Sequence, residues 1–304
     1  MSTIMITVTH KMFDDSHLKE GYQVVSVGNT KVEKQGWRKD SDGENISYEN
    51  PWYCELTAQY YGWKNLLLTE QYVGICHYRR YFMSYKASSK SIWEDIISTS
   101  EIEKILSVHK IILPYMGCKV PGSSMLLRGI EDEKQDKNWL IIRDIIHSEF
   151  PDYSSSFDKI IYGMNQVWFN MFIARKEVFE AYCSWIFLLL KKYDEHLVAH
   201  ELKRTPRVDG FLSELLLLVW VDKNIKPSEI YNLDVKNVEQ TIISYDNKGS
   251  IKGRILRKLY CHKQILDIGM TIKCRMRTFR VKMKIYQNKQ KILDSIKKGN
   301  EGMI

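Results

Sequence analysis

The sequence has few Pro and Gly, no Cys pattern typical of disulfides or metal sites, and no long apolar run. Its 304 residues include 6 Pro and 16 Gly, so it lacks the composition of a disordered or collagen-like protein. Its six Cys form no CxxC pair and no regular framework, which favours reduced thiols in a cytosolic protein. The apolar runs Trp185 to Leu190 and Leu215 to Val221 are both far shorter than the ~20 residues needed to cross a bilayer. We therefore expect an ordinary soluble globular protein without a membrane span.

Common catalytic motifs are absent too. No P-loop, GxGxxG, HExxH or GxSxG occurs. Asp40-Ser41-Asp42 has the letters of a DxD motif, but it lies in a Gly-flanked loop and is as well explained by a turn. No histidine pair has metal-ligand spacing with a partner on one predicted helix. The N-terminal segment alternates apolar and polar residues without a preceding basic region, which predicts a first strand instead of a signal peptide. We predict no metal site.

Strands alternate with helices along the chain. Apolar, strand-like segments lie at 4–8, 22–27, 72–82, 110–114, 167–174 and 230–235, and helical periodicity marks 52–65, 92–108, 136–150, 176–192 and 207–221. This alternation predicts an α/β fold with a mixed sheet flanked by helices. We expect one domain over residues 1–245, followed by a different segment over 246–304.

Residues 72–82, YVGICHYRRYF, are the most informative stretch. A buried strand runs into His77, Arg79 and Arg80 without a turn signal. Ligands of open α/β sheets bind at the carboxyl ends of strands, and guanidinium groups suit a phosphate or carboxylate. The segment therefore predicts an anion site. The alternative is a solvated strand end in which Arg stacks on Tyr.

Other polar residues also follow or interrupt apolar segments. His10 comes directly after the first strand, where a nucleotide commonly binds. Asn170 interrupts the apolar segment WFNMFI, so it either binds a sugar hydroxyl or satisfies a neighbouring backbone group. Glu55, Asp209 and Glu214 lie beside apolar residues. Each is a candidate general base with a raised pKa, or a group that caps a helix.

Five blocks of the chain, taken together, resemble a bacterial family of capsular and exopolysaccharide glycosyltransferases that was first catalogued as a domain of unknown function. The blocks, in order, lie at 42–65, 72–82 with the HYRRYF signature, 110–114, 169–187 and 207–220. The resemblance covers about residues 4–235. It departs from the family pattern at 121–137, and at Leu215, where the family more often has Arg.

The resemblance implies a GT-A-like fold and a nucleotide-sugar donor, with UDP-galactofuranose as one candidate. It places the donor beside the residues of the early blocks, Asp42, Asn45, Ser47, Asn50, Tyr53, Glu55, His77, Arg79 and Arg80. It places Asn170 on the acceptor side. His77, Arg79 and Arg80 would then stand where related enzymes keep metal-binding Asp residues, so we expect activity without a metal ion, and the alternative is dependence on Mn²⁺ or Mg²⁺.

The basic charge belongs to the C-terminal segment. Residues 248–304 contain 16 Lys and Arg against 3 acidic residues, a charge of +13, which leaves −5 for residues 1–247. Apolar residues recur there at helical spacing, as in Ile251, Ile255 and Leu259. A basic amphipathic helix suits an anionic membrane surface. The alternatives are a nucleic-acid-binding arm, which the few aromatic residues disfavour, and packing of the apolar stripe on the main domain.

The sequence thus predicts an inverting hexosyltransferase of capsule, O-antigen or exopolysaccharide synthesis. It would transfer a sugar from a UDP-linked donor to a lipid-linked oligosaccharide, with Glu214 or else Asp209 as the general base. We expect it in the cytoplasm, peripheral on the inner face of the plasma membrane. The alternative function is a non-catalytic glycan- or nucleic-acid-binding module with a basic arm.

Overall fold

The computed structural model describes residues 2–28, 32–86, 91–115, 120–121, 138–161, 164–165 and 169–238. The predicted boundary at 245, the basic segment 246–304 and most of 121–137 lie outside the described residues. Within them, no helix is long and apolar enough to cross a membrane.

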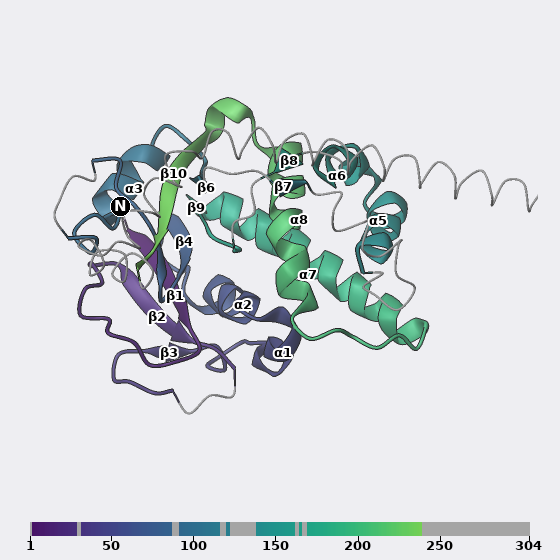
Figure 1. The fold of residues 1–304 in the computed structure, drawn as a ribbon, viewed down its shortest axis with the longest axis horizontal. Coiled ribbons are helices and arrows are strands. Elements are labelled where there is room, and N and C mark those ends of the chain that lie inside the picture. The colour runs from purple at the N-terminus through teal and green to yellow at the C-terminus, as the bar shows by residue number, and fades with distance from the viewer. Residues whose placement is uncertain are drawn as a thin grey trace, which may run out of the picture.

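A mixed β-sheet forms the centre of the molecule (Figure 1). Its first part is parallel, in the order β3 (Arg38–Lys39), β2 (Tyr22–Ser26), β1 (Thr3–Thr9) and β4 (Tyr72–His77). β4 also pairs antiparallel with β9 (Phe172–Arg175), which pairs antiparallel with β6 (Ile111–Tyr115). β10 (Ile230–Asn237) joins β6 in parallel and β5 (Arg80–Phe82) in antiparallel pairing. The predicted mixed α/β architecture is therefore confirmed.

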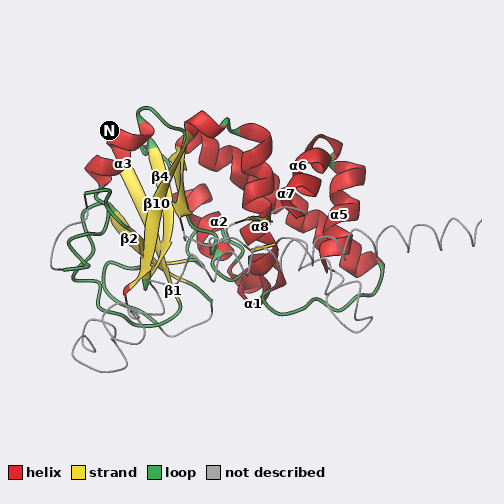
Figure 2. Cartoon of the chain, turned by 45° about the horizontal axis from the view of Figure 1, so that its top comes forward, coloured by secondary structure: helices red, strands yellow, loops and turns green. Residues whose placement is uncertain are grey.

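Alternate residues of β1 and β4 pack against two different layers, because successive side chains of a strand point to opposite faces. Ile6, Val8, Val73 and Ile75 join the helices of the larger core, whereas Met5 and Cys76 join a smaller core that includes α3 (Thr99–Leu106). Figure 2 shows α3 on one side of the sheet and the other helices gathered on the opposite side.

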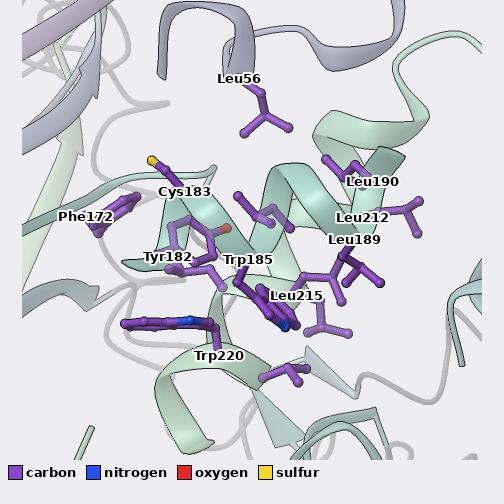
Figure 3. Close-up of a cluster of buried hydrophobic side chains, with 14 of the residues drawn as sticks. Leu56, Phe172, Tyr182, Cys183, Trp185, Leu189, Leu190, Leu212, Leu215 and Trp220 are labelled. Atoms are coloured by element: carbon purple, nitrogen blue, oxygen red, sulfur yellow. The ribbon is translucent and has the colours of Figure 1, made fainter. Parts of the chain in front are cut away.

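The helical layer contains α2 (Leu56–Asn65), α5 (Asn138–Glu149), α6 (Ser154–Ile161), α7 (Lys176–Ala199) and α8 (Val208–Asn224). Figure 3 shows the apolar cluster between α7 and α8, where Tyr182, Trp185 and Leu189 meet Leu215 and Trp220. All five side chains are at most 7% exposed. This packing fixes α8, whose first turns border the site described below. Short elements complete the chain: α1 (Asn50–Tyr53), β7 (Val120–Pro121), β8 (Met164–Asn165), and the 3-10 turns Ser47–Glu49, Pro151–Tyr153 and Pro227–Glu229.

Several element boundaries differ from the sequence predictions. The segment 72–82 is two strands, since β4 ends at His77 and a turn at Tyr78 and Arg79 leads back into β5, so that His77 pairs with Arg80. The predicted helix 52–65 is broken at Cys54, which separates α1 from α2. The helix predicted from 92 begins at Thr99 behind a Ser98 capping box. Apolar periodicity reports neither the turn after His77 nor the break at Cys54, and the helix start at Thr99 is set by the local capping box of Ser98 and Glu101.

Candidate active site

A cleft of about 620 Å³ opens at the carboxyl ends of the parallel strands. Thr9 ends β1 and His10 follows it, Val27 follows β2, and His77 ends β4. Because these strands run in parallel, their carboxyl ends meet at one edge of the sheet, the usual position of a ligand crevice. Asn50 and Pro51 of α1 and Phe211 and Glu214 of α8 provide the opposite wall.

One backbone hydrogen bond fixes the elements of each cleft wall. The Arg207 N–H donates to Pro51 O over 2.9 Å, which ties the start of α8 to α1. The Tyr78 N–H donates to Val8 O over 3.0 Å, which ties the turn after β4 to β1. Each wall of the cleft is thus held together by a main-chain hydrogen bond between its own elements.

Three arginines line the cleft. Arg79 belongs to the turn between β4 and β5, Arg80 begins β5, and Arg207 precedes α8. Each is close to an aromatic ring, with guanidinium-to-centroid distances of 5.5 Å to Tyr78, 4.1 Å to Phe169 and 5.2 Å to Phe211 respectively. Stacking on rings orients a guanidinium while leaving its N–H edge for an anion. Burial, together with the neighbouring Arg79, lowers the pKa of Arg80.

Two glutamates face these cations. Glu55 and Glu214 both line the cleft. Burial of Glu214, and then the negative charge of Glu55, raise the pKa of Glu214 to about 7, against an opposing effect of Arg80 and Arg207. A carboxylate that titrates near neutral pH can exchange a proton with a substrate.

The two histidines of the cleft are held neutral at pH 7. Burial lowers the pKa of His77, and burial with the nearby Lys11 and Arg79 lowers that of His10. His77 Nε2 lies 2.8 Å from Phe169 O. Since a carbonyl only accepts, Nε2 carries the proton and Nδ1 is the free acceptor of the neutral ring.

Backbone strain concentrates at this site. Five non-glycine residues in the described part of the chain have positive φ: Cys54, Phe169, Asn170, Glu201 and Arg207. Cys54, Phe169 and Arg207 line the cleft, and Asn170 lies directly beneath it. Such conformations cost about 1–3 kcal/mol each and persist only when surrounding contacts impose them.

Seven of the residues proposed from the sequence line this cleft: His10, Asn50, Glu55, His77, Arg79, Arg80 and Glu214. Residues 79 and 80 belong to a turn and a second strand, not to one continuous strand.

Six other candidates lie elsewhere. Asp42, Asn45 and Ser47 belong to an exposed loop that bonds mainly to itself: Asp42 accepts from the Lys39 N–H at 3.0 Å, and Asn45 accepts from the Ser47 hydroxyl at 2.9 Å. Tyr53 is buried, and its hydroxyl donates to Asp194 at 3.2 Å. None of the four borders the cleft.

Asp209 and Asn170 are buried below the cleft. Asp209 is fully buried and accepts from Arg204 Nη2 at 2.7 Å, although burial still raises its pKa to about 6. Asn170 is 2% exposed, and it belongs to a turn before β9 instead of interrupting a strand. Its amide is bonded to protein groups, as described below. Neither side chain reaches the cleft.

Sequence reasoning missed Arg207, Phe169, Cys54 and Tyr78 as cleft residues. Arg207 stands immediately before the recognisable segment VDGF, but only its left-handed backbone, φ 63, brings its side chain to the arginines after β4. Among the described residues, no three His, Cys, Asp or Glu side chains are grouped to hold a metal ion.

A family model described as "Domain of unknown function (DUF4422)" matches residues 4–225. The chain belongs to this family. The DUF4422 match spans every element that lines the cleft. A comparison with curated proteins gave no match.

The DUF4422 fold of this chain is similar to a solved structure, the apo form of WbbM, a bifunctional glycosyltransferase. The TM-score is 0.60 at 24% identity, and the match covers 78% of this chain and 45% of that chain. This likeness establishes the fold. Because the match covers 45% of the WbbM chain, this protein corresponds to less than half of its length.

Proposed function

We propose that this protein is a glycosyltransferase that transfers a hexose from a nucleoside diphosphate to a hydroxyl of a glycan acceptor. The observation that carries the proposal is the cleft itself, in which three arginines and two glutamates meet at the carboxyl ends of parallel strands. The similarity to a bifunctional glycosyltransferase supports it at the level of the fold. We further propose a GT-A-like enzyme with a UDP-linked donor, UDP-galactofuranose being one candidate.

The cations would bind the diphosphate. Arg79, Arg80 and Arg207 line one cleft, and their planar groups can offset the charge that develops on the leaving diphosphate as the bond to the sugar breaks. This is the role that a divalent cation has in other enzymes. We therefore propose transfer without a metal.

Glu214 would be the general base. The acceptor oxygen attacks the anomeric carbon, its proton passes to the Glu214 carboxylate, and the diphosphate leaves with the electron pair of the broken C–O bond. Direct in-line attack of this kind inverts the anomeric centre. With a pKa of about 7, Glu214 combines an adequate ionised fraction at neutral pH with useful basicity.

The acceptor and the location are proposed from the sequence. A lipid-linked oligosaccharide of capsule, O-antigen or exopolysaccharide synthesis fits the resemblance of the five blocks, and the basic segment 246–304 would hold the enzyme on the inner face of the plasma membrane.

The direct test measures release of the nucleoside diphosphate from a panel of UDP-, GDP-, CDP- and dTDP-sugars, with glycan acceptors present. We expect UDP release from one donor, unchanged by EDTA. Arg79→Ala and Arg80→Ala should each lower turnover by roughly 10²- to 10³-fold while the circular dichroism spectrum stays the same. Loss of turnover in EDTA with recovery in Mn²⁺ would reject the metal-free mechanism, and no release from any donor would reject the transferase.

A further inference from the structure

Phe169 and Asn170 are two successive non-glycine residues with left-handed backbone, φ 55 and φ 56. Asn tolerates this conformation, but Phe does not favour it. Among the described residues, no other adjacent pair of non-glycine residues has positive φ. The contacts that impose this turn run to the ionisable groups of the cleft.

Phe169 contacts three of these groups. Its carbonyl bonds to His77 Nε2 at 2.8 Å, and its ring lies 4.1 Å from the Arg80 guanidinium. Its backbone N–H bonds to the Glu214 carboxylate and opposes the rise in the pKa of that group. Phe169 therefore links both walls of the cleft.

Asn170 contacts the fourth group. Its Nδ2 donates to Glu55 Oε1 over 2.7 Å and to Gly210 O over 2.9 Å, while its Oδ1 accepts from the Ser213 hydroxyl over 2.9 Å. Both amide hydrogens are thus used inside the protein, which leaves none for a sugar. Asn170 is 2% exposed, and of the three residues that its side chain contacts, Glu55 is the one that lines the cleft.

The position of Glu55 matters because Arg80 is near. Glu55 and Arg80 line the same cleft, and the negative charges of Glu214 and then Glu55 oppose the lowering of the Arg80 pKa by burial. Yet no ion pair joins Arg80 to a carboxylate among the residues that the structure describes. A Glu55 side chain free to rotate could pair with Arg80 and compete with any anion there.

We propose that Asn170 is a positioning residue, which holds the Glu55 carboxylate away from Arg80 so that the Arg80 guanidinium stays available to an anionic ligand of the cleft. The inference rests on the proposed role of Arg80 in binding a diphosphate. Because the proposal concerns the ligand-free protein, a crystal structure of a variant can test it without any assay of turnover.

The experiment uses Asn170→Gly in the full-length protein. Glycine accepts left-handed backbone without strain, so this variant removes the amide and keeps the turn. Titration calorimetry with pyrophosphate should show affinity weakened about tenfold or more, because Arg80 becomes paired with Glu55. Adding Glu55→Gln to Asn170→Gly should restore affinity to within about threefold of the wild type, since a neutral amide cannot neutralise Arg80.

Glu201→Gly is the matched control. Glu201 also has left-handed backbone, φ 52, but it is exposed and does not line the cleft. Its replacement should leave pyrophosphate affinity unchanged.

A purely structural role for Asn170 predicts a different pattern. Asn170→Gly would then lower the melting temperature, and Glu55→Gln would restore nothing. That result overturns the proposal. A crystal structure of Asn170→Gly decides the question even if the wild type binds no pyrophosphate: Glu55 turned toward Arg80 supports positioning, and an unmoved Glu55 rejects it. Absence of pyrophosphate binding by the wild type would instead count against the proposed function.

Discussion

At the scale of single residues, Glu214 is the group whose state depends most on the solution. It lies on α8, lines the cleft, and has its pKa raised to about 7 by burial and by Glu55. Its protonation therefore changes within the physiological range, and both catalysis and stability should follow it.

The first prediction concerns stability and pH. The pKa of Glu214 is about 7 in the folded protein against an ordinary 4.5, so the folded state binds this proton more tightly than the unfolded chain. The resulting stabilisation is fully present below pH 4.5 and is lost as the pH rises through 7. Glu214→Gln lacks this titration. Its free energy of unfolding relative to the wild type should therefore be higher at pH 8 than at pH 5, by on the order of 2 kcal/mol.

Urea denaturation at both pH values measures this difference. The same variant should lose transfer at every pH, whereas wild-type turnover should increase through pH 7 as Glu214 ionises. An equal stability difference at pH 5 and pH 8 would show that Glu214 does not titrate between them.

Gly28 gives a second prediction at this scale. It has φ +76, and a Cβ placed there would lie 2.6 Å from Asn50 Oδ1. Asn50 cannot turn away freely, because its Nδ2 donates to Cys54 O at 2.9 Å and to Thr57 Oγ1 at 3.1 Å. Gly28→Ala should thus lower the free energy of unfolding by about 1–3 kcal/mol.

Gly36→Ala is its control. Gly36 has a similar φ, +88, but an added Cβ meets no atom within 4 Å. It reports the backbone cost alone, so equal losses in the two alanine variants would rule out the clash with Asn50.

At the scale of elements, the break between α1 and α2 shapes the cleft wall. Cys54 has φ 52 and ψ −126, which ends α1 after one turn and lets α2 begin at Leu56. Burial raises the pKa of the Cys54 thiol to about 11, so it is protonated at neutral pH. Cys54 therefore shapes the cleft wall through its backbone conformation and not through a thiolate.

Cys54→Gly and Cys54→Ala separate these contributions. Both variants remove the sulfur, but only glycine relieves the left-handed backbone. We expect the glycine variant to be more stable than the alanine variant by about 1 kcal/mol. Thermal unfolding at pH 7 measures the difference, and equal melting temperatures would mean that the break stores no strain.

A partly buried ion-pair network, in which only Asp209 is fully buried, anchors the start of α8. Arg204 bonds to Glu49, to Asp194 at 3.0 Å and to Asp209 at 2.7 Å, and its guanidinium lies 4.8 Å from the Trp52 ring. Burial raises the pKa of Asp194 to about 7 and that of Asp209 to about 6. The network joins α1, α7 and the segment before α8, so it supports the cleft from below.

Arg204→Met should destabilise the protein by about 3–5 kcal/mol at pH 8, because it leaves the carboxylates buried without a cation. The loss should be smaller at pH 5. The pKa values of Asp194 and Asp209 are already raised, and removal of Arg204 raises that of Asp209 further. More of these carboxyl groups are therefore protonated at pH 5, and a neutral carboxyl group costs less free energy to bury than a carboxylate. Chemical denaturation at the two pH values tests this, and a loss independent of pH would assign the effect to lost packing on Trp52.

At the scale of the whole molecule, charge divides the chain into an acidic main part and a basic C-terminal part. Residues 248–304 carry +13 and residues 1–247 carry −5. Each cation near an anionic bilayer contributes about 1 kcal/mol, and salt screens the attraction.

Removing residues 248–304 should therefore release the protein from vesicles that contain phosphatidylglycerol while leaving pyrophosphate binding intact. Sedimentation with vesicles measures the first effect, and neutral phosphatidylcholine vesicles are the control. Equal binding of the shortened and full-length proteins to the anionic vesicles would contradict a membrane role, and tight binding of the full-length protein to RNA would favour the nucleic-acid arm.

The sequence by itself determined the class of the fold and the position of the site along the chain. Apolar periodicity marked the strands and helices, because burial of one face follows from the order of residues. His10, His77, Arg79 and Arg80 could be placed at strand ends, because parallel strands bring those ends to one edge.

Only the tertiary structure decided which polar residues share the cleft. Asp209 has the same local signals as Glu214, but Arg204 holds it in the interior. Asn170 supports Glu55, and Arg207 joins the cleft through a left-handed residue. Such assignments depend on contacts between residues 5 to 155 positions apart, and apolar periodicity contains no information on which of many possible partners a buried charge will find.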